Sequence, residues 1–296
     1  MPNWVVAGAT GRVGSVVARE LIASGATTRV IVRSEAAARE WRERGAEAAV
    51  GSLGDPAFLS GVLHGSEGCF TLLPESVPRE DFHGARRRMA DAVAAAVSAS
   101  GVPRVVMLSA IAAALPDGNG PAKDLHYCEN RLRATAARVA VLRACYFQDN
   151  IAGVLPVAAQ SGVYPNFLGD ADVEFPMVAT RDVGRVAAET LSAASPAGGT
   201  IDLLGPRYSI RQVATLLGGA LGRPVRVVDV PPAEHVPSLV RAGVPEPLAV
   251  ILAEMFGAVA AGMIVPSAER RIVGTTTIDQ VIRECVERSG ARPQAQ

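Results

Sequence analysis

Short apolar runs alternate with helix-periodic stretches along the first half of the chain. Residues 4–7 are an apolar run that predicts a strand, and residues 13–23 carry apolar side chains at the spacing of one helix face. The same alternation predicts strands at 29–32, 48–50, 68–73, 105–109 and 139–142, and helices at 37–44, 58–63, 89–100 and 121–137. Strands that alternate with helices are typical of a parallel sheet covered on both faces. We therefore predict an α/β fold with a doubly wound parallel sheet of the Rossmann type.

The pattern loosens beyond residue 150, where glycine and proline break residues 151–177 into short pieces. A helix at 181–193 and a strand at 200–204 are expected to return to the sheet. Further helices are predicted at 210–221, 245–264 and 278–288, the last capped by Thr277. We expect two parts, a dinucleotide-binding domain of residues 1–150, 178–204 and 271–290, and a smaller, mostly helical substrate lobe of residues 151–177 and 205–270.

The segment Gly8-Ala9-Thr10-Gly11-Arg12-Val13-Gly14 lies between the first predicted strand and the first predicted helix. Glycines at this point let backbone amides and the helix N-terminus approach a pyrophosphate. Because strand, loop, helix and second strand follow in the expected order, the segment indicates dinucleotide binding more strongly than glycine spacing alone. The loop residues expected to contact the cofactor are Gly8, Thr10, Gly11, Arg12, Val13 and Gly14.

The second predicted strand ends at Arg33, where proteins of this fold that bind NAD place an acidic residue. The acidic side chain holds the ribose 2′-hydroxyl, whereas an arginine accommodates a 2′-phosphate. Arg33, with Arg12 in the glycine loop, therefore predicts NADP(H) rather than NAD(H) as the cofactor. The alternative is an arginine solvated at a strand end.

Charge and cysteine content narrow the classes of partner. The 296 residues include 29 basic and 29 acidic side chains, and no long run of one sign favours nucleic acid or a membrane surface. We interpret Arg86-Arg87-Arg88 as a solvated helix face. The four cysteines lie far apart without metal-ligand spacing, so we expect no metal, reduced thiols and a cytoplasmic protein. The apolar segment 248–265 is interrupted by Glu254 and two glycines, so we interpret it as a buried helix.

Several further segments carry a family likeness, at 8–14, 32–34, 51–56, 129–135, 142–150, 181–184, 204–206 and 220–224. In this order they resemble the atypical short-chain dehydrogenases/reductases of the NmrA-like group over almost the whole chain. Two positions depart from that group's pattern. Ser52 stands where the group often has an acid facing adenine, and Ala144 replaces the proline usual after the arginine.

The resemblance implies a choice of functions. Members of the group include NADPH-dependent ketone and quinone reductases, enzymes of polyketide or antibiotic biosynthesis, and proteins that sense the NADP redox state without catalysis. We expect hydride transfer from NADPH to a ketone or quinone carbonyl of an aromatic or polyketide-like small molecule. A non-catalytic NADP(H)-binding sensor or regulator is the alternative. The oligomeric state is left open.

The ordinary short-chain enzymes take their proton from a Tyr-x-x-x-Lys pair, which this chain lacks. Its single lysine, Lys123, stands four residues before Tyr127 instead of four after it. Tyr127 either gives a proton, with Lys123 or Arg131 as its positive neighbour, or packs at the helix start. Ser109 either orients a carbonyl or bonds the backbone, and His126 either donates a proton or lies at the surface. An acidic phenol on the substrate, or water, is the remaining proton source.

The carboxyl ends of the strands should surround the reacting part of the cofactor. Besides the glycine loop and Arg33, the expected cofactor contacts are Ser52, Leu73, Pro74 and Ser109. The expected substrate contacts, including one on the apolar helix that would cover the pocket, are Ile111, His126, Tyr146, Phe147, Asn150 and Met255. The candidate catalytic residues are Ser109, His126 and Tyr127.

Overall fold

The centre of the molecule is a parallel sheet whose strand order reverses beside the first strand. The structure is a computed structural model that describes residues 4–74, 80–194 and 198–290. Within these residues the sheet has eight strands in the order β13-β10-β6-β5-β4-β1-β2-β3. The strands are β1 Trp4–Ala7, β2 Thr28–Val32, β3 Glu47–Val50, β4 Gly68–Thr71, β5 Arg104–Ala110, β6 Arg138–Ala144, β10 Gly199–Leu204 and β13 Arg270–Val273. The predicted doubly wound α/β fold is confirmed.

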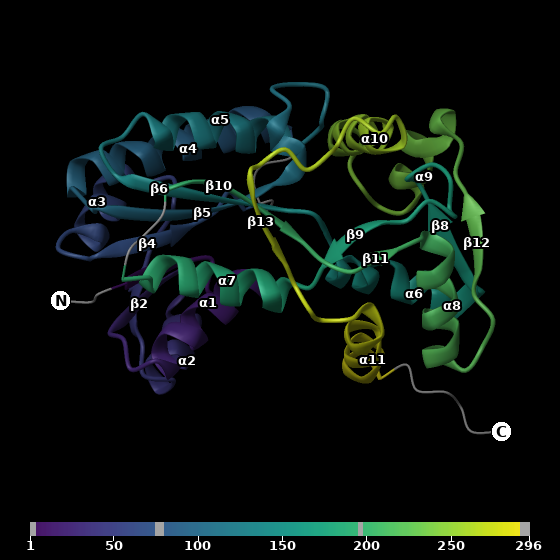
Figure 1. The fold of residues 1–296 in the computed structure, drawn as a ribbon, viewed down its shortest axis with the longest axis horizontal. Helices are drawn as coiled ribbons and strands as arrows, with labels where there is room; N and C mark the ends of the chain where they lie inside the picture. Colours follow the sequence, from purple (N-terminus) through teal and green to yellow (C-terminus); the bar gives the residue numbers. More distant parts are fainter. Residues whose placement is uncertain (1–3, 75–79, 195–197, 291–296) are drawn as a thin grey trace.

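Helices cover both faces of this sheet (Figure 1). One face carries α1 (Arg12–Ala23), α2 (Glu35–Glu43) and α7 (Thr180–Ser192), and the other carries α3 (Pro56–Leu63), α4 (Phe82–Ser100) and α5 (Ala122–Arg133). The sheet buries an apolar core on each side, as its near-continuous apolar strands require. At Gly184 an added Cβ would lie 2.5 Å from the Val16 Cβ, because α7 packs closely on α1.

A smaller lobe lies beside the carboxyl ends of the strands (Figure 1). Its helices are α6 Ile151–Ser161, α8 Ile210–Leu221, α9 His235–Arg241 and α10 Glu246–Ala260. Two small sheets complete it, one formed by β8 Val163–Asn166 and β12 Arg226–Asp229, the other by β7 Tyr146–Phe147, β9 Phe175–Val178 and β11 Arg207–Tyr208. Short 3-10 helices occur at η1 Ile111–Ala114, η2 Gln148–Asn150 and η3 Pro232–Glu234.

The end of the chain serves both parts of the molecule. Strand β13 extends the main sheet by pairing with β10. The last helix, α11 (Ile278–Ser289), instead buries Ile278, Val281 and Ile282 in the lobe's apolar core against α6 and α8. The last strand and the last helix therefore join different cores.

Two of our interpretations of exposure were wrong. The apolar segment 248–265 does not form a buried helix, because only Ala249 and Ala258 of α10 are buried and Val250 is 53% exposed. Arg86 does not lie on a solvated face but is 1% exposed, because it shares a helix face with the buried Phe82 and Ala90. Among the described residues no helix is both long and apolar enough to cross a membrane.

Candidate active site at the carboxyl edge of the sheet

The glycine loop joins β1 to α1 with little room to spare. Gly8 has a φ of 66°, and an added Cβ on Gly14 would overlap the Gly8 carbonyl and lie 2.8 Å from the Ala7 oxygen. Gly11, the N-cap of α1, is extended and offers no side chain to cap the helix. The first amides of α1 are thus available for a phosphate. Thr10 and Arg12 are exposed beside them and Val13 is buried, so this cradle fits a dinucleotide's pyrophosphate.

The two arginines predicted to hold the 2′-phosphate lie at different places. Arg33 is exposed directly after β2. Arg12 instead donates from Nη1 to the backbone oxygen of Asp149, 2.8 Å away in η2. Ser52, after β3, is exposed, and its Oγ accepts from the Gly54 amide at 3.1 Å. Of the two arginines, Arg33 is the one at the strand end, where proteins of this fold discriminate NADP from NAD, and its contact with the 2′-phosphate stays a prediction.

A buried ion cluster that sequence reasoning missed supports the end of β4. Arg86 donates from Nη1 to the carbonyl oxygens of Leu73 and Pro74, at 3.3 and 3.0 Å. Its Nε lies 3.3 Å from Asp124 Oδ2, which is 2.8 Å from Nδ1 of His83. Asp124 is fully buried at the start of α5, so the ion pair needs these neighbours. The sequence contained one signal for the burial of Arg86, which stands at helical spacing between the apolar residues Phe82 and Ala90 of α4.

Ser109 belongs to a second buried network at the end of β5. Its Oγ donates to Glu129 Oε1 at 2.6 Å. The fully buried Glu129 also accepts from Nε and Nη2 of Arg143, at 3.0 and 2.7 Å, and pairs with Arg133 at 3.0 Å. Because the Ser109 proton is engaged with a carboxylate, this hydroxyl presents acceptor lone pairs toward its remaining surroundings.

Tyr127 lies in a different network, between α5 and α4. Its hydroxyl donates to Asp91 Oδ1 at 2.9 Å, and Arg131 Nε contacts the same oxygen at 2.7 Å. The hydrogen bond to Asp91 raises the pKa of Tyr127, and its desolvation and the negative charge of Asp91 add to the rise. Lys123 pairs with Asp117 at 3.4 Å. The structure thus does not join Tyr127 to Ser109 in one network, and acid catalysis by Tyr127 stays a prediction.

His126 shares a face of α5 with Glu129 and is half-buried. Its Nδ1 lies 2.8 Å from the backbone oxygen of Ala113 in η1, which also accepts from Arg143 Nη2 at 3.4 Å. Ile111, the first residue of η1, is 5% exposed. His126 is therefore held at the segment that directly follows β5.

The predicted aromatic substrate contacts after β6 lie on opposite faces of a short strand, with Tyr146 against the lobe core and Phe147 against the core of the main sheet. Tyr146 and Phe147 make up β7 and are both half-buried, and the Tyr146 ring meets Phe175 edge to face at 5.6 Å. Burial raises the pKa of Tyr146, while hydrogen bonds with Asn150 and Tyr164 oppose the rise. Asn150 itself is exposed. Tyr146 therefore offers an apolar ring whose phenol is already hydrogen-bonded to Asn150 and Tyr164.

The lobe also touches the sheet domain through α10. Gly120, with a φ of 60°, precedes α5, and an added Cβ there would lie 2.8 Å from the Cβ of Met255 on α10. The backbone of α10 thus packs directly on the loop that leads to His126. Met255 is half-buried, which places an apolar side chain close to the start of α5.

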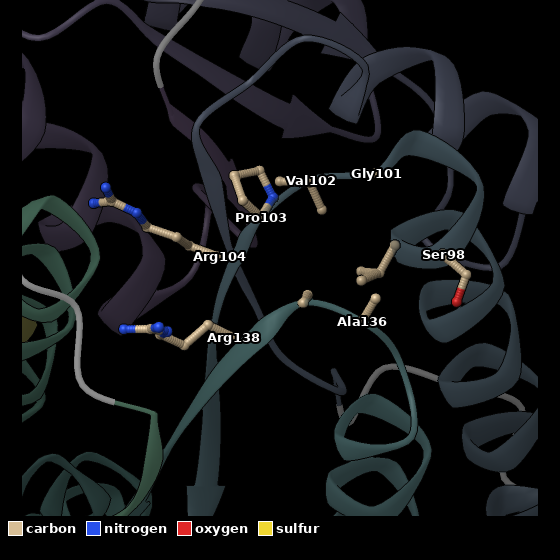
Figure 2. Close-up of a pocket in the computed structure, with 9 residues that line it drawn as sticks. Ser98, Gly101, Val102, Pro103, Arg104, Ala136 and Arg138 are labelled. Atoms are coloured by element: carbon tan, nitrogen blue, oxygen red, sulfur yellow. The ribbon is translucent and has the colours of Figure 1, made fainter.

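Two other features lie apart from the predicted chemistry. Burial raises the pKa of Cys69, Cys128 and Cys145 to about 12, so these thiols stay protonated at neutral pH. A hollow of about 600 Å³ lies at the amino ends of β5 and β6. Among its lining residues, Arg104 and Arg138 extend to the same side (Figure 2). The hollow is at the sheet edge opposite to the glycine loop.

The sheet order, the glycine loop and the open helix N-terminus define a dinucleotide-binding protein of the Rossmann type. The model of the NmrA-like family matches residues 3–282, and the chain belongs to this family. It is 27% identical over 253 residues, 85% of both chains, to an NAD(P)H azoreductase from Xenophilus azovorans.

Solved structures share the fold. An NADPH-dependent quinone oxidoreductase from Escherichia coli, complexed with NADPH, superposes with a TM-score of 0.82 and 23% identity, over 95% of this chain and 99% of the other. A triphenylmethane reductase from a Citrobacter species, complexed with NADP(H), gives 0.80 and 21%, over 96% and 99%. At these identities the likeness concerns the arrangement of the chain.

Proposed function

We propose that the protein is an NADPH-dependent reductase that delivers a hydride to a conjugated acceptor, such as a quinone, an azo dye or an aromatic, polyketide-like ketone. The observation that carries the proposal is the glycine cradle under the open N-terminus of α1, in a chain of the NmrA-like family. The azoreductase, quinone oxidoreductase and triphenylmethane reductase among its similar proteins support the acceptor class.

Some residues of the site bind the cofactor, and others position the cofactor and the substrate. NADPH, when bound, supplies the hydride. The loop from Gly8 to Gly14 binds the pyrophosphate, and Arg33 binds the 2′-phosphate. Leu73 and Pro74, fixed by Arg86, border the nicotinamide pocket. Tyr146 and Phe147 contact the substrate from β7, and α10 covers it.

A conjugated acceptor suits a site without a Tyr-x-x-x-Lys pair. Negative charge that develops on a quinone or azo group is spread over its rings, so the reaction requires less from a protein acid than reduction of a simple ketone. The half-exposed apolar face of α10 supplies a cover for such a molecule. We also propose that residues 151–177 and 205–270 select the substrate, while residues 1–150, 178–204 and the strand at the start of 271–290 hold the cofactor.

The proposal is tested by mixing the protein with NADPH and a panel of quinones, azo dyes and aromatic ketones and following loss of NADPH absorbance. Turnover of at least one conjugated acceptor is expected. NADPH binding without turnover of any of them, combined with different affinities for the oxidised and reduced cofactor, would favour the sensor instead.

Tyr127→Phe is expected to retain reductase activity, with kcat within about threefold of wild type. Its hydroxyl is engaged by Asp91, and its raised pKa opposes proton release. Steady-state kinetics with a quinone measure the effect, and thermal unfolding reports the lost hydrogen bond. Complete loss of activity in a folded variant would restore the ordinary tyrosine mechanism.

A further inference from the structure

Each side chain that an ordinary short-chain reductase would use at this edge is already engaged elsewhere. The hydroxyl of Ser109 donates its proton to a hydrogen bond with Glu129, and the hydroxyl of Tyr127 donates its proton to Asp91. Lys123 forms an ion pair with Asp117. All three partners are carboxylates, which hold a proton or a positive charge in place. With these three side chains engaged, the proton of the reduced substrate comes from a substrate phenol, from water or from another donor on the protein.

His126 is placed to be that donor. It precedes Glu129 by three residues on the same face of α5, and Glu129 contacts Ser109 at the end of β5. Helix α5 starts at the carboxyl edge of the sheet, so one turn from Glu129 toward its N-terminus leads toward the substrate side. The half-buried imidazole lies against Ala113, two residues beyond Ile111.

The hydrogen bond to Ala113 fixes which nitrogen of His126 can exchange a proton. A carbonyl oxygen only accepts, so Nδ1 must carry a hydrogen in both the neutral and the charged ring. Nε2 is then the nitrogen that gains and loses the exchangeable proton. Ala113 is fully buried and its oxygen also accepts from Arg143, so this anchor is well defined.

The charged groups that adjoin His126 on α4, α5 and β6 are paired. On β6, Arg143 is bound to Glu129. On α5, Lys123, which precedes His126 in the chain, is bound to Asp117. On α4 the charges of Arg87 and Asp91 lie at the Tyr127 ring and hydroxyl. On the lobe side, α10 carries the half-buried Glu254.

Resting on the reductase proposed above, we infer that His126 is its proton donor, anchored through Nδ1 and giving the Nε2 proton to the substrate atom that becomes negative. A quinone gains one hydride and one proton to become a hydroquinone. The hydride comes from NADPH, which leaves as NADP⁺, and the proton breaks from Nε2 and bonds to the quinone oxygen. The neutral imidazole then takes a proton from solvent.

Two kinds of acceptor separate proton donation from binding. A quinone needs a hydride and a proton, whereas a cationic triphenylmethane dye becomes neutral on gaining a hydride alone. His126→Asn keeps an N–H donor near the Ala113 oxygen but has no titratable nitrogen. It is expected to lower kcat for the quinone about 100-fold, the usual scale of general acid catalysis. In the same variant, kcat for the dye should change less than about threefold. In the control variant His64→Gln, at the end of α3, kcat for both substrates should also change less than about threefold.

Two further readouts complete the test. The quinone kcat of the wild type should fall as the pH rises and the exchangeable proton on Nε2 is lost, and the Asn variant should lack this dependence. In the protein without cofactor, nitrogen NMR of neutral His126 should show the hydrogen on Nδ1.

The inference is overturned by unchanged quinone turnover in a folded His126→Asn, by equal losses of kcat for quinone and dye, or by a hydrogen on Nε2 of the neutral ring. If the protein does not reduce the dye, the pH dependence of quinone turnover in the wild type and in His126→Asn tests whether His126 donates the proton. Wild-type protein that binds NADPH but turns over no acceptor refutes the proposed function itself.

Discussion

Gly14→Val is expected to abolish NADPH binding. A Cβ at this position overlaps the Gly8 carbonyl and lies 2.8 Å from the Ala7 oxygen, so the side chain can fit only if α1 moves away from β1. That movement displaces the amides that should hold the pyrophosphate. Isothermal calorimetry should detect no binding at concentrations that saturate the wild type.

The matched control is Gly219→Val on α8, where an added Cβ meets no atom within 4 Å in the described structure. This variant carries the same helical valine and should bind NADPH normally. Circular dichroism establishes that both variants are folded, and the milder Gly14→Ala serves if the valine variant is not. Undiminished affinity in a folded Gly14 variant would contradict the cradle.

Arg33→Asp is expected to weaken NADPH binding about 100-fold while changing NADH binding less than about threefold. The substitution removes charge-assisted hydrogen bonds to the 2′-phosphate and places a negative charge beside it, and NADH has no such phosphate. Titration of both cofactors measures the two affinities. Arg19→Asp, an exposed change on the third turn of α1, controls for net charge. Equal losses for both cofactors would remove the assignment of Arg33.

The main sheet was predictable because its signals are local. The apolar runs of β1, β5 and β10 and the helix-periodic stretches between them identify the elements to within a few residues, except that α4 begins seven residues earlier than expected. The lobe's strands were missed, since β7 and β11 have two residues each and β8 contains a proline. Helix α6 was also missed, because Pro156 lies inside it and packing of Ile151 and Leu155 outweighs the break.

The candidate site was predictable in part. The glycine loop and Arg33 follow from strand and loop order, which the sequence displays directly. The cluster of Arg86 with Asp124 joins residues 38 positions apart, and the bond from Ser109 to Glu129 spans 20. Such contacts depend on how α4 and α5 rotate against the sheet, which periodicity does not specify.

The sequence by itself determined the class of fold, the phosphate-binding loop and the lack of a Tyr-x-x-x-Lys pair, because each is a matter of residue type at short spacing. Only the tertiary structure decided which proton donors are engaged. Neighbouring residues of one helix, His126 and Tyr127, point to Ala113 and to Asp91, on different elements of the fold. A hydrogen bond depends on distance and direction between atoms that are remote in the chain, and the packing of the core sets both.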